Sequence, residues 1–205
     1  MAYTDFTLES AEAELGVTTR PGPIFPNLAP VPVPAWLRDV LARGMRLALV
    51  SEKARSEFVV APILLALREL SGDRIAILSG QRLDVDPARR LQGECDFLLA
   101  LSEPVPRLRA PVAAAVAKKN DIDAGLGQCI AQLAAVQVYN ERSGRPLGSV
   151  YGCVTTGEDW QFFRLTGAEV TIGKGRHYIS DVGGILAMLQ AMVQQAVAAA
   201  LAEAG

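Results

Sequence analysis

The chain has 205 residues, of which 50% are hydrophobic and 20% charged, and this composition excludes global disorder and suits one domain with a sizeable core. The 20 basic and 22 acidic residues leave a formal charge of −2, which excludes a polybasic chain and leaves only a local patch for nucleic-acid contacts. The single histidine, His177, excludes a histidine-rich metal centre. Three widely spaced cysteines without a CxxC pair indicate buried thiols rather than zinc ligands or disulfides.

Residues 1–35 are predicted to form a proline-rich arm that precedes a single domain over 36–205. Six of the twelve prolines fall within 21–34, and proline removes backbone donors, so this stretch is expected to be extended and not a central strand. Its interspersed apolar side chains favour packing along the body. Residues 1–14 carry four acids and no base, the opposite of a signal peptide, which predicts a cytoplasmic protein.

Two helices are expected after the arm. The apolar stripe of residues 36–48 predicts a short helix, and Ser51 is typical of the N-cap of a second helix that runs to about residue 70. Pro62 should bend or break that second helix, because proline cannot donate to the preceding turn.

The remaining elements predict a mixed α/β fold. Apolar runs at 74–83, 94–102 and 111–118 suit buried strands, and two or three more strands are expected among 149–155, 159–165 and 169–172. A long helix is expected over 124–140 and a last helix from about 180 to 203. This order is typical of one mixed sheet between layers of helices.

The last helix contains the longest apolar stretch, residues 185–202. Three glutamines interrupt it and alanine dominates it, so an amphipathic or buried helix is expected rather than a membrane span. The helix offers more apolar surface than one sheet face needs. A homodimer through this helix is therefore predicted.

Asp96 and Lys118 are the most informative pair of charged residues. Each stands in or at the end of an apolar strand, where a charge is costly to bury. The two strands are consecutive, so the two side chains are candidates for neighbours at one sheet end. An acid that binds a divalent metal and a lysine that positions water or phosphate would suit phosphodiester hydrolysis. The alternatives are a salt bridge or a lysine that simply reaches solvent.

Four segments together resemble the PD-(D/E)xK superfamily, which has the restriction-endonuclease-like fold. They are SEKARSEFVVAPILLALREL, GECDFLLALS, PVAAAVAKKNDIDAGLGQCIAQLAAVQVYN and YGCVTTGEDWQFFRL. The resemblance is to a branch of uncharacterised bacterial proteins and covers roughly residue 51 to the C-terminus. It implies a core made of a helix, a three-strand meander, a second helix and a further strand, with Mg²⁺ or Mn²⁺ as cofactor and DNA or RNA as substrate.

The resemblance also implies roles for four residues of this chain. Asp96 matches the metal-binding aspartate, and Lys118 matches the catalytic lysine. Glu57 matches an additional metal-shell glutamate of some members. Gln128 matches a helix glutamine that supports the site.

Val116 departs from the motif, because the family places Asp or Glu two residues before the lysine and valine cannot ligate a metal. Glu94, two residues before Asp96 on the same strand face, is one candidate replacement. Asp121 and Asp123 are weaker candidates, since an aspartate before a helix is typically a cap. Glu57 and Asp96 alone could also hold a metal loosely.

The sequence therefore predicts a nuclease-like protein of unknown substrate with impaired catalysis at the motif acid. The alternative is a non-catalytic nucleic-acid-binding or protein-interaction module on the same fold. A basic rim near the sheet end could serve the nucleic-acid role, although charge runs are usually solvated faces. Its residues would be Arg89, Arg90, Arg107, Arg109, Lys118 and Lys119.

Overall fold

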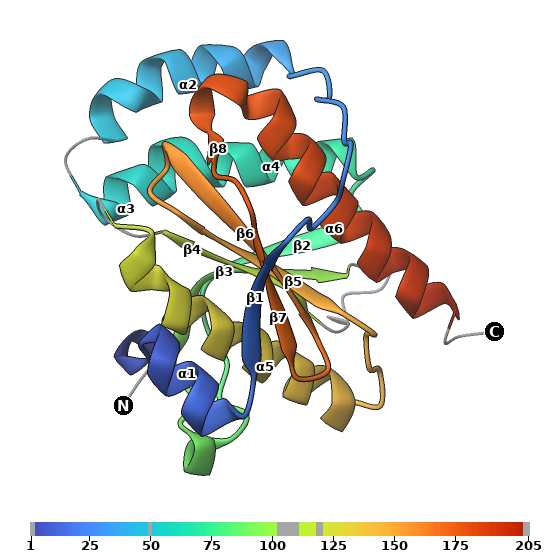
Figure 1. Cartoon of the computed structure of the whole chain (residues 1–205). Helices are drawn as coiled ribbons and strands as arrows, with labels where there is room; N and C mark the ends of the chain where they lie inside the picture. The colour runs from blue at the N-terminus through green and yellow to red at the C-terminus, as the bar shows by residue number, and fades with distance from the viewer. Residues whose placement is uncertain (1–2, 49–50, 102–110, 118–120, 203–205) are drawn as a thin grey trace.

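The computed structural model describes residues 3–48, 51–101, 111–117 and 121–202, with the backbone alone for 111–117 (Figure 1). The strands are β1 (Thr18–Gly22), β2 (Ile75–Arg82), β3 (Glu94–Leu101), β4 (Pro111–Ala117), β5 (Val150–Thr155), β6 (Asp159–Thr166), β7 (Glu169–Gly173) and β8 (His177–Tyr178). The α-helices are α1 (Leu8–Leu15), α2 (Ala35–Ala48), α3 (Glu52–Arg55), α4 (Ala61–Leu70), α5 (Leu126–Arg142) and α6 (Val182–Ala202). Short 3-10 turns are η1 (Tyr3–Asp5), η3 (Pro87–Arg89), η4 (Asp123–Gly125) and η5 (Ile179–Asp181), and η2 (Ser56–Val60) is a π-helical turn.

One mixed sheet organises these elements. Its strand order is β1-β7-β6-β5-β4-β3-β2, with β8 paired to β6. Strands β2, β3 and β4 form an antiparallel meander, and β5 lies parallel to β4 after the crossover through α5. Strands β5, β6 and β7 alternate in direction. The predicted mixed α/β class is therefore confirmed.

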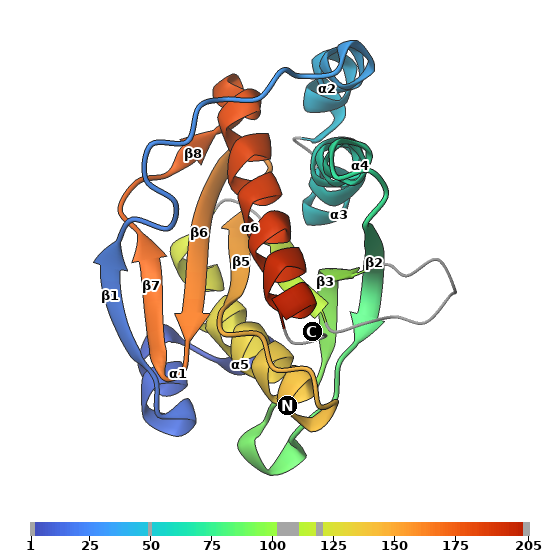
Figure 2. The same ribbon diagram turned by 90° about the vertical axis from the view of Figure 1, so that its right-hand side faces the viewer.

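Helices cover both faces of the sheet. Helix α5 packs against β4 and β5, with α1 and η1 outside it, while α4 contacts β2 and α6 contacts β4. Helix α2 makes its main contacts with α3, η2 and α4 rather than with the sheet (Figures 1 and 2). The structure is thus a sheet between helical layers, with α2 as an additional outer helix on one side.

The predicted break at Pro62 takes the form of a π-helical turn. Pro62 has no N–H to offer the carbonyl of Phe58, and the backbone just before it closes a five-residue turn, Ala61 N–H to Ser56 O. Helix α2 approaches this point closely through Gly44. A Cβ at Gly44 would stand 2.4 Å from the Phe58 carbonyl oxygen, so only glycine permits this helix contact.

The N-terminal segment contains more regular structure than the sequence predicts. Helix α1 begins after a capping box at Thr7, and β1 joins the sheet parallel to β7. Pro21 lies in β1, which is an edge strand, where a missing backbone donor is tolerated. Further along, the Val31 N–H donates to the Gly183 carbonyl at the start of α6. Residues 3–35 are thus built into the same body as the rest.

Helix α6 is largely a core helix. Ile185, Leu186 and Leu189 are completely buried, whereas Leu201 near its end is 67% exposed. With its preceding turn it is the one helix in the described part that is long and apolar enough to cross a membrane by length and composition, which is weak evidence because buried core helices share these properties. Much of the apolar surface of α6, from which a dimer was predicted, is therefore buried within the chain. A dimer through α6 and a cytoplasmic location remain predictions.

Candidate functional site

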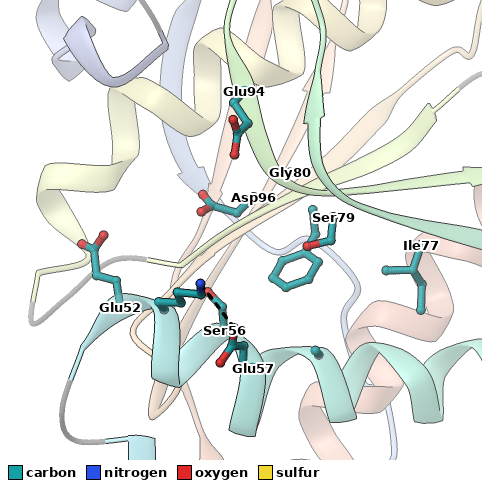
Figure 3. Close-up of a pocket in the computed structure, with 11 residues that line it drawn as sticks. Glu52, Ser56, Glu57, Ile77, Ser79, Gly80, Glu94 and Asp96 are labelled. Carbon is teal, nitrogen blue, oxygen red and sulfur yellow. Dashed lines mark ion pairs between the residues drawn. The ribbon is translucent and has the colours of Figure 1, made fainter.

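A cleft of about 590 Å³ opens between the helical segment α3–η2–α4 and strands β2 and β3 (Figure 3). Most of the charged side chains that line the cleft are carboxylates, and Lys53 is the one cationic side chain among the described lining residues. Two of the acids belong to the helical wall and two to β3 (Figure 3). These acids are Glu52, Glu57, Glu94 and Asp96. The structure therefore brings together three acids that the sequence singled out, Glu57, Glu94 and Asp96, and adds a fourth.

The helical wall owes its shape to the π-helical turn. Ser51 caps the first turn, its Oγ accepting the Ala54 N–H at 3.1 Å, and the π turn then begins at Ser56. Such turns insert an extra residue into a helix and are frequent at functional sites. Ser56 and Glu57, the first two residues of the turn, line the cleft. Glu57 is 55% exposed and lies 3.9 Å from Lys53, a loose surface pair worth little energy.

Glu52 is the cleft acid that sequence reasoning missed as a site residue. In a regular α-helix, residues five apart diverge by about 140°, so Glu52 and Glu57 would not be expected on one wall. Both nevertheless line the cleft, Glu52 from α3 and Glu57 from the π turn that follows it. Spacing along the helix gave no signal for Glu52.

The strand wall presents its acids from β3. Glu94 and Asp96 are two residues apart, so they share a strand face, and Asp96 is half-buried while Glu94 is exposed. On the neighbouring strand Gly80 has a φ of +63°, a left-handed conformation that favours glycine. A Cβ at Gly80 would meet the Glu94 carboxylate at 3.4 Å, so the absence of a side chain at position 80 leaves that acid room.

The backbone register places Val116 beside Asp96. The pairing of β3 with β4 ends at Phe97 and Ala115, and one residue further along lie Asp96 on one strand and Val116 on the other. The two positions that the resemblance requires to carry acids are therefore adjacent across the sheet. Valine carries no oxygen ligand, so this arrangement supplies one carboxylate where the motif needs two.

Lys118, the predicted catalytic lysine, lies outside the described residues, as do Lys119, Arg107 and Arg109. The described acids do not converge on one point. Among the residues that the structure describes, no group of three His, Cys, Asp or Glu side chains is placed to hold a metal ion. Mg²⁺ demands a few oxygen ligands in near-octahedral geometry, and the described cleft acids do not fit such a site.

Gln128, predicted to support the site, is on α5 and does not line the cleft. It is 4% exposed, and its Oε1 has no hydrogen-bond partner among the described residues. One turn further along, Gln132 is completely buried, and neither of its amide atoms pairs with a described residue. A buried amide group that is left without any partner costs about 1–3 kcal/mol. The described contacts do not connect them to Asp96.

Asp121 and Asp123 serve the start of α5 rather than the cleft. The Asp121 carboxylate accepts the N–H groups of Asp123 at 2.8 Å and Ala124 at 3.2 Å, which is a cap. Asp123 forms an ion pair with Arg176 at 3.0 Å. Neither acid lines the cleft. They therefore offer no substitute for an acid at Val116 in this arrangement.

The three cysteines are free and buried, as the sequence predicts. Burial raises the pKa of Cys95 to about 12, with the nearby acids Asp96, Glu94 and Asp84 adding to the effect. Burial also raises the pKa of Cys153 to about 12 and shifts the pKa of Cys129 upward. A thiol that stays protonated is a poor nucleophile and a poor metal ligand. Cysteine chemistry is thus not a property of this site.

Comparisons with protein-family models and with curated proteins find no match to this chain, so its function is inferred from the fold and the cleft.

Proposed function

We propose that this chain is a PD-(D/E)xK-type nuclease-like protein whose metal-dependent phosphodiester hydrolysis is lost or severely impaired. The element order supports the restriction-endonuclease-like core: helix α4, the antiparallel meander β2-β3-β4, the crossover helix α5, and β5 parallel to β4. Strands β6 and β7 and helix α6 extend this core. The cleft lies beside the meander, where the resemblance implies that the acids gather.

The observation that carries the proposal is the register of β3 and β4. Asp96 and Val116 lie one residue beyond the Phe97–Ala115 pair on adjacent strands, which supports a motif that keeps its strand positions and lacks one ligand. Glu52, Glu57 and Glu94 are carboxylates in the same cleft, yet they do not assemble with Asp96 into a metal-binding group within the described residues.

The electrostatics of the cleft argue in the same direction. Four carboxylates and one described lysine create a negative field that repels a phosphate backbone. The net charge of −2 offers no compensating attraction for non-specific nucleic-acid binding. Between the two non-catalytic roles, a protein-interaction module is therefore favoured over a nucleic-acid-binding one.

The proposal is tested by a cleavage assay that asks whether an acid at position 116 increases cleavage. The unchanged chain, Val116→Glu and Val116→Gln are incubated with labelled single- and double-stranded DNA and RNA in Mg²⁺ and in Mn²⁺. Val116→Gln is the matched control, because glutamine has the size of glutamate without its charge. We expect Val116→Glu to cleave roughly 10–100-fold faster than Val116→Gln, the usual scale for one interaction at a metal site. The additional change Asp96→Asn should abolish the gain.

Two outcomes would contradict the proposal. A folded Val116→Glu variant that cleaves no better than Val116→Gln would mean that the site is not of this type. Efficient cleavage by the unchanged chain that disappears in Lys118→Ala would mean that catalysis is intact. Glu94→Gln and Glu57→Gln would then identify the acid that replaces Val116.

A further inference from the structure

We draw no further inference here: the strongest candidate, the exposed apolar patch of Val40 and Leu47 on α2 with Phe58 on η2 and Leu65 on α4, carries none because nothing in the described part of the chain shows what covers it.

Discussion

The two walls of the cleft hold their acids in different ways. The strand wall places Asp96 on β3, which is hydrogen-bonded to β2 on one side and to β4 on the other and is followed by buried residues on both faces. The helical wall places Glu52 and Glu57 on exposed turns, around a π-helical insertion, against the outer helix α2. The strand wall is therefore the better supported of the two, and under the proposed function the exposed glutamates of the helical wall do not stand in for an acid at Val116.

The largest expected effect is on stability: truncating a side chain of the strand wall should lower the free energy of unfolding far more than truncating one of the helical wall. Leu98→Ala, at a position that is 1% exposed in β3, should lower the free energy of unfolding by about 2–5 kcal/mol. Leu65→Ala, on the solvent face of α4, should change it by about 0.5 kcal/mol or less. Urea denaturation measures both. Similar losses for the two variants would show that the walls are equally well packed and would break the comparison.

The second prediction concerns the support of the helical wall. Gly44→Ala places a Cβ 2.4 Å from the Phe58 carbonyl oxygen and must push α2 away from η2. The expected loss of unfolding free energy is about 1–3 kcal/mol, the usual cost of overpacking. Gly148→Ala is the matched control, because nothing lies within 4 Å of its added Cβ and its φ is not positive. Equal stability of the two variants would contradict the close helix contact.

The third prediction concerns the cap that starts the helical wall. Ser51→Ala removes the acceptor for the Ala54 N–H, and the expected loss is about 1 kcal/mol. Ser51→Asp keeps an acceptor at the same position and should retain most of the stability. If the alanine and aspartate variants melt together in thermal denaturation, Ser51 does not act as a cap.

The smallest effect is a pH dependence at His177, away from both walls. Burial lowers the pKa of His177, although the charge of Asp181 acts in the opposite direction. The rings of His177 and Phe162 pack edge to face, with their centroids 5.1 Å apart. The pKa of His177 is 6.5 in the unfolded chain and lower in the folded chain, so between these two values the unfolded chain binds more protons. The free energy of unfolding therefore falls as the pH drops from 7 through 6.5 toward the folded pKa. His177→Gln should flatten this part of the stability profile. An unchanged profile would rule out the contribution.

The fold was largely predictable because its central elements have strong local patterns. The runs expected at 94–102 and 111–118 correspond to β3 (Glu94–Leu101) and β4 (Pro111–Ala117), and the last helix begins within a few residues of its expected start. Strand β1 was not predicted, since a five-residue edge strand with Thr, Pro and Gly gains its order from the distant partner β7. Helix α1 and the two-residue β8 were missed as well, being short elements held by tertiary contacts.

The sequence predicted the residues of the candidate site only where the position of a residue on a strand indicates which side chains lie near it. Asp96 and Val116 could be assigned to consecutive strands, but the neighbour expected for Asp96 was Lys118, which lies outside the described residues. Glu52 could not, because its place on the cleft wall depends on how the helical segment lies against β2 and β3, which no local pattern shows. The roles of Asp121 and Asp123 were undecided until their partners at the α5 start were visible.

The most direct test of the central claim is Mn²⁺ binding measured by isothermal titration calorimetry on Val116→Glu and Val116→Gln. If the scaffold of the site is intact and lacks one acid, Val116→Glu should bind Mn²⁺ roughly 10–100-fold more tightly than Val116→Gln, and Asp96→Asn should remove that gain. Equal, weak binding by the two folded variants would contradict the account, because the position beside Asp96 would then not belong to a metal site.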